Sequence, residues 1–280
     1  MALRIITDST ADISQAEAKE LGLTVVPLNV LANGKTYEDG VTLSTEEFYQ
    51  ILETSEALPS TSQPSPEAFL KYFKEIKEAG DEAVVILIGT CISGTVQSAN
   101  LAKNMVEYDK IYIIDSDTAA CGLNLLVREA LKLANKGMDG EAVAKEITAL
   151  KERVRLVVLL DTLDYLIKGG RISKTAGAVG SLIKLKPVIT LTKDGISMLD
   201  KARGTKGGFK SLKNNINDQK WDVSYPVYFG YAKDEQLTKD FFEMAKTEWE
   251  ISESWFGPTG CVIGTHTGPG AVIIAYVKEV

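Results

Sequence analysis

The feature that most constrains the fold is the alternation of short apolar runs with amphipathic stretches in the first half of the chain. Nearly continuous apolar runs are typical of strands in a sheet that is covered on both faces. Four such runs are Leu3–Thr7, Thr24–Val30, Ala83–Ile88 and Ile111–Asp115. Because strands that alternate with helices need crossover connections, we predict a parallel sheet in this half.

Three helix starts between these strands carry readable caps. Ser14 precedes a stretch that Gly22 ends, and Ser44-Thr45-Glu46-Glu47 has the pattern of a capping box. Ser65 followed by Pro66 places a cap before a proline at the first helical position. These signals predict helices that begin at each of the three serines.

The pattern changes near residue 153, after which hairpin signals mix with helix signals. Predicted strands are Val154–Leu160, Pro187–Lys193, Ile196–Ala202, Val227–Tyr231, Cys261–Thr265 and Ala271–Val277. Predicted helices are Leu163–Lys168, Ser173–Lys184, Gly208–Asn217 and Glu235–Glu248. Asp194-Gly195 is a hairpin turn signal. A chain of 280 residues is long enough to form two domains, each with its own hydrophobic core. We predict two α/β domains: a parallel-sheet domain over 1–153 and an α+β domain with a mainly antiparallel sheet over 154–280.

Composition excludes several classes of protein. The formal net charge of −7 disfavours a nucleic-acid binder, and no apolar run approaches the roughly 18 residues of a membrane span. The N-terminus lacks the pattern of a signal peptide, so we expect a cytoplasmic protein. Three scattered cysteines without C-x-x-C spacing predict neither a disulfide framework nor a zinc site.

Five polar or glycine-rich segments lie at the ends of predicted elements, where α/β proteins bind ligands. They are Thr7-Asp8-Ser9, Ser60–Pro66, Ser93-Gly94-Thr95, Gly170-Arg171-Ile172-Ser173 and His266–Gly270. Ser93 and Thr95 offer hydroxyls at a helix start, which favours an anion, or Ser93 simply caps that helix. Ser60–Pro66 presents hydroxyls on a loop stiffened by prolines, or forms an ordinary helix entry with Ser65 as its cap.

The remaining candidates have competing interpretations as well. His266 is the only histidine, and its imidazole either donates to a carboxylate or has a structural role. Asp8 either serves a catalytic or metal role or closes the loop after the first strand. Arg171 and Arg203 are functional cations or ordinary solvated surface charges.

Familiar catalytic motifs are missing from the sequence. It contains no P-loop, no G-x-G-x-x-G after the first strand and no G-x-S-x-G. No cluster of histidine and cysteine indicates a transition metal. An enzyme hypothesis remains in which Asp8, Ser93 and His266 act on a small anionic substrate as a phosphotransferase or hydrolase.

Taken together, the five segments resemble those of the DegV family, the fatty-acid-binding subunits of bacterial fatty acid kinase. Each segment is weakly diagnostic alone, but five in this order make the resemblance specific, and it runs essentially from end to end. It implies a non-catalytic protein without cofactor or metal that binds one long-chain fatty acid at the domain junction, with the tail within the second domain.

The resemblance also implies roles for individual residues. The fatty acid would be bound by Thr61, Ser62, Ser93, Thr95, His266 and Thr267. Its carboxylate would be held by Thr61 or Ser62, together with Ser93 and His266. Arg171 and Arg203 would face a separate ATP-dependent fatty acid kinase, which forms an acyl phosphate that feeds phospholipid synthesis. The resemblance implies no nucleic-acid partner and no integral membrane segment, with membrane contact at most transient. Ala176, Ala178, Val179, Leu182 and Ile183 either line the tail or are ordinary core residues of the second domain.

Overall fold

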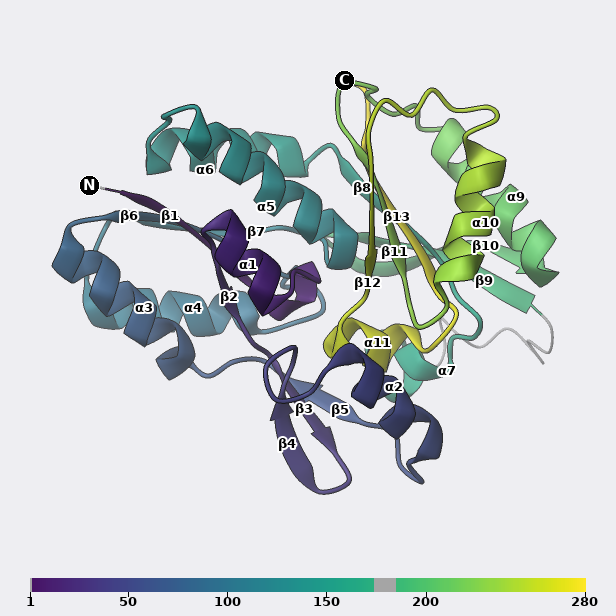
Figure 1. Ribbon diagram of the computed structural model, residues 1–280, viewed down its shortest axis with the longest axis horizontal. Coiled ribbons are helices and arrows are strands. Elements are labelled where there is room, and N and C mark those ends of the chain that lie inside the picture. The colour runs from purple at the N-terminus through teal and green to yellow at the C-terminus, as the bar shows by residue number, and fades with distance from the viewer. Residues whose placement is uncertain (1, 174–184) are drawn as a thin grey trace.

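The structure is a computed structural model that describes residues 2–173 and 185–280, and its two main sheets stand side by side (Figure 1). A parallel sheet of four strands belongs to the first half of the chain, and a six-stranded, mostly antiparallel sheet belongs to the second half. A small three-stranded sheet lies at the lower edge of the view. The predicted α/β class, with one parallel and one mainly antiparallel sheet, is confirmed.

The parallel sheet has the strand order β2-β1-β6-β7, and every neighbouring pair in it is parallel. Its strands are β1 (Leu3–Asp8), β2 (Thr24–Val26), β6 (Glu82–Leu87) and β7 (Ile111–Asp115). Side chains alternate between the two faces, so Ile5 and Ile6 of β1 enter different cores. Helices cover both faces, which explains why these strands are apolar almost throughout.

Five helices cover this sheet, with α3 and α4 on one face and α1, α5 and α6 on the other (Figure 1). They are α1 (Gln15–Leu21), α3 (Pro66–Ala79), α4 (Thr95–Val106), α5 (Ala120–Asn135) and α6 (Gly140–Lys151). Ser14 caps α1 and Gly22 ends it, as predicted. Ser65 precedes α3 as predicted, although its hydroxyl accepts no backbone N–H of that helix.

The three-stranded sheet corrects one prediction. Its strands are β3 (Asn29–Ala32), β4 (Lys35–Glu38) and β5 (Ser60–Ser62), in the antiparallel order β4-β3-β5. The apolar run Thr24–Val30, predicted as one strand, is divided between β2 and β3. Pro27 lies between them, and a residue without a backbone N–H interrupts a strand ladder. The predicted capping box of Ser44 and Glu47 begins α2 (Thr45–Thr54), which follows this sheet.

The six-stranded sheet has the order β10-β9-β8-β13-β11-β12, and only the β11–β12 pair is parallel. Its strands are β8 (Val154–Leu159), β9 (Leu185–Thr192), β10 (Gly195–Arg203), β11 (Val227–Tyr231), β12 (Ser254–Pro258) and β13 (Val272–Val277). Helices α9 (Gly204–Asn217) and α10 (Glu235–Ala245) cover its outer face. Short helices α7 (Asp164–Lys168) and α11 (Cys261–Thr267) lie near its inner edge.

One core joins the two main sheets through α5. Leu123 of α5 shares a single hydrophobic cluster with Ile86 of the parallel sheet and with Leu156 and Ile273 of the six-stranded sheet. Helix α5 therefore lies between the sheets and contacts both. The halves of the chain are packed together closely.

Several other predictions differ from the structure. Cys261–Thr265, predicted as a strand, begins helix α11 instead. The helix predicted over Glu235–Glu248 ends at Ala245, and α9 begins at Gly204 rather than near Gly208. Helices α5 and α6 and strands β4, β5 and β12 were not predicted. Most of the helix predicted over Ser173–Lys184 lies outside the described residues.

Candidate functional site

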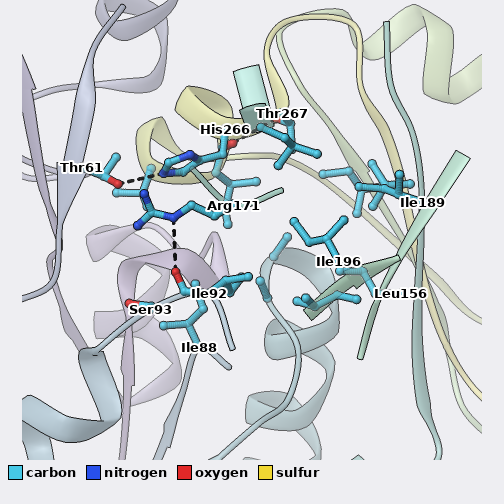
Figure 2. Close-up of a pocket in the computed structure, with 18 of the residues that line it drawn as sticks. Thr61, Ile88, Ile92, Ser93, Leu156, Arg171, Ile189, Ile196, His266 and Thr267 are labelled. Carbon is cyan, nitrogen blue, oxygen red and sulfur yellow. Dashed lines mark hydrogen bonds between the residues drawn. The ribbon is translucent and has the colours of Figure 1, made fainter. Parts of the chain in front are cut away.

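A pocket opens between the first half of the chain and the inner face of the six-stranded sheet (Figure 2). Its empty space is about 750 Å³, counting the open mouth. The lining comes from β5, the segments that follow β6 and precede α5, the inner face of β8, β9, β10 and β13, and helix α11. Both halves of the chain are therefore needed to form the pocket.

One side of the pocket is an apolar wall. It includes Leu156, Val158, Ile189, Leu191, Ile196 and Ile273. Because strand side chains alternate, Val157 and Leu159 of β8 point the other way and pack against the helices of the outer face. Strand β8 is therefore apolar on both faces: one set of its side chains lines the pocket, and the other packs against the outer helices.

The opposite side of the pocket is polar, and Figure 2 shows Thr61, Ser93, Arg171 and His266 gathered there. Thr61 Oγ1 lies 2.8 Å from His266 Nε2, although the two residues are 205 positions apart in the chain. Thr61 is placed by the pairing of β5 with β3, and His266 by the last turn of α11. The structure therefore brings together two residues that the sequence singled out separately.

Helix α11 positions His266. The first turn of this helix is capped by two aspartate side chains from the first half of the chain. The N–H of Gly260 donates to Asp12 Oδ1 at 2.8 Å, and the N–H of Cys261 donates to Asp39 Oδ1 at 2.9 Å. These acceptors satisfy N–H groups that a helix start leaves unpaired. Burial raises the pKa of both carboxyl groups. This tertiary capping explains why the segment is a helix and not the predicted strand.

His266 is neutral in this setting. Burial, with a smaller effect from the positive charge of Arg171, lowers its pKa to about 3. Its Nδ1 atom is buried and has no hydrogen-bond partner among the residues that the structure describes. The imidazole therefore offers a hydrogen bond to an anion, but no full positive charge near neutral pH.

Arg171 supplies the cation of the pocket lining. Its Nη1 donates to the carbonyl oxygen of Gly169 at 2.7 Å, and its Nε donates to the carbonyl oxygen of Ile92 at 3.3 Å. These bonds join the end of α7 to the loop that follows β6. The guanidinium is half-buried, and this burial lowers the pKa of Arg171 from its ordinary value.

Ser93 and Thr95 take different places around the pocket. Ser93 lines the pocket, and its Oγ lies 2.8 Å from Thr95 Oγ1. The N–H of Thr95 donates to Ser93 Oγ at 3.3 Å, so Ser93 satisfies one N–H at the start of α4, whose N-cap is Gly94. Thr95 itself is fully buried and outside the lining, which makes it a support for Ser93.

Four further polar residues line the pocket: Ser62, Gln63, Thr190 and Thr267. Ser62 is exposed at the mouth, and Thr267 is buried with its hydroxyl donating to the carbonyl oxygen of Ile263 at 3.0 Å. Gln63 donates from Nε2 to Ser98 Oγ at 2.9 Å, which ties the β5–α3 loop to α4. Sequence reasoning gave Gln63 no separate role, although its position beside Thr61 and Ser62 was the available signal.

Two candidates lie outside the lining. Arg203 is exposed at the end of β10, where it precedes α9. Asp8 is buried, and its carboxylate accepts hydrogen bonds from the N–H of Thr10, the hydroxyl of Thr10 and the N–H of Ile88. Asp8 thus closes the loop after β1, and its oxygens do not line the pocket in which Ser93 and His266 lie. This arrangement counts against the enzyme hypothesis.

The residues that the structure describes contain no cluster of side chains suited to a metal ion. Nor does any helix in this part of the chain have the length and apolar character to cross a membrane. The candidate tail-lining residues Ala176, Ala178, Val179, Leu182 and Ile183 lie outside the described residues.

Comparison with known proteins gives a consistent result. The family model described as "Uncharacterised protein, DegV family" matches residues 2–279. A DegV domain-containing protein of Caldanaerobacter subterraneus subsp. tengcongensis is 33% identical over 278 residues, with 99% of each chain covered. A fatty-acid-binding DegV family protein from Thermus thermophilus has a TM-score of 0.88 at 32% identity, covering 99% of this chain and 100% of the other.

A third comparison extends the fold match to a more distant protein. The Fatty Acid Kinase (Fak) B3 protein from Streptococcus pneumoniae, solved loaded with linoleic acid, has a TM-score of 0.88 at 23% identity. The match covers 100% of both chains. At this identity the likeness shows that the two proteins share one fold.

Proposed function

Because the chain belongs to the DegV family, we propose that it binds one long-chain fatty acid in the pocket between its two main sheets. The observation that carries this proposal is the division of the pocket into an apolar wall and a polar side. A fatty acid has a matching apolar tail and polar carboxylate. The similarity to a fatty-acid-binding protein from Thermus thermophilus supports the same ligand class.

The apolar wall would supply most of the binding free energy. Burial of one methylene contributes about 0.8 kcal/mol, so a chain of about 16 carbons contributes on the order of 12 kcal/mol before ordering costs. Leu156, Ile189 and Ile196 offer the hydrocarbon surface for this burial. The polar side then determines the orientation of the ligand.

The carboxylate would lie against Thr61, Ser93 and His266. A buried carboxylate needs hydrogen bonds, because an ion that leaves water without them costs several kcal/mol. The hydroxyls of Thr61 and Ser93 can provide them, with His266 holding the hydroxyl of Thr61 in place, and the nearby guanidinium of Arg171 offsets the negative charge. Ser62 at the mouth and Thr267 beside His266 are further hydroxyls in the lining.

We further propose that the protein presents this carboxylate to a separate ATP-dependent fatty acid kinase. This part rests on the family resemblance and on the positions of two arginines. Arg171 stands beside the proposed carboxylate position, and Arg203 is exposed. A kinase that binds there would contact Arg171 and form an acyl phosphate for phospholipid synthesis, and the exposed Arg203 is proposed as a second contact with it. The protein itself would act as a cytoplasmic binding subunit without catalysis.

Organic-solvent extraction of the purified protein, followed by mass spectrometry, tests the ligand. We expect about one fatty acid per chain from the wild type. Ile196→Glu places a carboxylate in the apolar wall and should abolish the yield, whereas Ser197→Glu, exposed on the same strand and outside the lining, should preserve it. Failure of the wild type to retain or take up oleate or palmitate would contradict the proposal.

A further inference from the structure

Gly169 occupies a position where the backbone does not require glycine. Its φ of −73° and ψ of −8° lie in the helical region, which residues with a side chain also adopt without strain. The next residue, Gly170, has a φ of +72°, a left-handed conformation that does favour glycine. The absence of a side chain at Gly169 therefore needs another explanation.

The explanation is the close approach of His266. A Cβ atom on residue 169 would lie 2.3 Å from His266 Nδ1 and 2.8 Å from Cε1. Both distances are far below the roughly 3.5 Å at which non-bonded heavy atoms meet favourably. The opposite edge of the ring is held by Thr61, whose Oγ1 lies 2.8 Å from Nε2. The ring and a methyl group on residue 169 cannot both keep these positions.

This contact also selects the tautomer of the imidazole. Nδ1 faces the backbone of residue 169 and has no hydrogen-bond partner in the described part of the chain. A buried N–H without an acceptor is rarer in proteins than an unpaired acceptor atom. The proton of the neutral ring therefore belongs on Nε2, where it can donate to Thr61 Oγ1. The hydroxyl hydrogen of Thr61 is then free to donate to a ligand.

We propose that Gly169 is a positioning residue for His266: its missing side chain admits the ring and keeps the Nε2 proton directed at Thr61 and the pocket. Arg171 reinforces this placement, because its Nη1 donates to the carbonyl oxygen of Gly169. The effect of Gly169 on binding rests on the proposed fatty-acid site. The placement of the His266 ring is a property of the protein without ligand and does not depend on that site.

Gly169→Ala tests the proposal, with Gly207→Ala as the matched control. A Cβ on Gly207 would have its nearest neighbour, Ala202 Cβ, at 3.7 Å, an ordinary contact. We expect Gly169→Ala to weaken fatty-acid binding by about tenfold or more. Displacement of the His266 ring would disturb the hydrogen bond that Thr61 is proposed to donate to the charged carboxylate of the ligand. The control should bind as the wild type does.

The imidazole nitrogen chemical shifts of the ligand-free protein give a readout that a general loss of stability would not produce. His266 is the only histidine, so its signals are unambiguous. We expect the wild type to show the Nε2–H tautomer and Gly169→Ala to show altered shifts. Wild-type shifts of the Nδ1–H tautomer, or shifts that the substitution leaves unchanged, would overturn the proposal even if the wild type binds fatty acid.

A double-mutant cycle completes the test. In a His266→Ala background the ring is absent, so Gly169→Ala should no longer reduce affinity and should leave the melting temperature unchanged or raised. An equal loss of affinity in both backgrounds would assign Gly169 to another role and refute the proposal. If Gly169→Ala alone does not fold, recovery of folding in the double variant supports the same contact, and failure of the double variant to fold contradicts it.

Discussion

Thr61→Val removes one hydroxyl from the proposed carboxylate site with little change in shape. Thr61 lies in β5 and pairs with Val30 of β3, and valine suits a strand at least as well as threonine. We therefore expect the variant to fold. Its pocket would lack the oxygen that lies 2.8 Å from His266 Nε2 and the hydroxyl proposed to donate to the ligand.

The expected magnitude follows from the contacts that are lost. A hydrogen bond to a charged group contributes about 1.5–3 kcal/mol, which corresponds to roughly a 10- to 150-fold change in Kd. The imidazole keeps one N–H that can turn to the carboxylate, so the lower half of this range is expected. The apolar wall is untouched, and the variant should therefore still bind fatty acid.

Titration of delipidated protein with a fluorescent fatty acid, at one pH and salt concentration, measures this change. Thr148→Val is the matched control, because Thr148 is exposed on α6 and its hydroxyl donates only to the carbonyl oxygen of Ala144. The control should leave Kd unaltered. If Thr61→Val and Thr148→Val bind equally well, Thr61 does not contact the carboxylate and the proposed orientation of the ligand is wrong.

Four further predictions can be checked by similar means. Ser93→Ala should weaken binding by roughly 5- to 100-fold in the same titration, and unchanged affinity would limit Ser93 to its contact with Thr95. Arg203→Ala should spare binding and slow acyl-phosphate formation by a fatty acid kinase; loss of binding would contradict its exposed position. Because the pKa of His266 is about 3, affinity should show no step from imidazole titration between about pH 5.5 and pH 8, and a step near pH 6.5 would show that the ring is not neutral. Burial raises the pKa of Asp12 above its ordinary value of 3.8, so the stability that this carboxyl contributes is complete below pH 3.8 and is lost as the pH rises through its folded-state pKa. Asp12→Asn should remove this part of the pH dependence in chemical denaturation, and an unaltered curve would show that Asp12 does not titrate in this way.

Local signals in the sequence were sufficient for the strands of the parallel sheet and for several helix starts in the first half, but not for α5, α6, β4 or β5. Nearly continuous apolar runs and serine caps depend on neighbours within a few residues, and the structure confirms the caps at Ser14 and Ser44. The apolar strands of the parallel sheet could be predicted for the same reason. Pro27 was the visible signal that would have divided Thr24–Val30 into two strands.

Helix α11 could not be predicted from its own residues. Val262 and Ile263 are β-branched, and the run from Cys261 to Thr265 has the apolar character of a strand. The acceptors that stabilise its first turn belong to Asp12 and Asp39, more than 200 positions earlier. A single-sequence pattern contains no information on such a distant capping contact.

The site was predicted in its parts and not in its geometry. Thr61, Ser93 and His266 were chosen as separate segments, and only the packing of the two halves shows them on one side of a pocket. The neutral state of His266 and the pocket position of Arg171 depend on burial, which residue types alone do not give. Gly169 was visible only as part of a helix-ending pair of glycines.

The hydrogen bonds from the start of α11 to Asp12 and Asp39 have consequences for fragments of the protein and for its response to a ligand. A fragment that begins near residue 154 would carry α11 without its two acceptors and without the half of the pocket that β5 provides. Neither half alone would contain a binding site. A ligand bound between the halves would contact both of them and stabilise the folded protein as a whole. Occupancy should therefore raise the melting temperature, with both halves unfolding in a single cooperative transition.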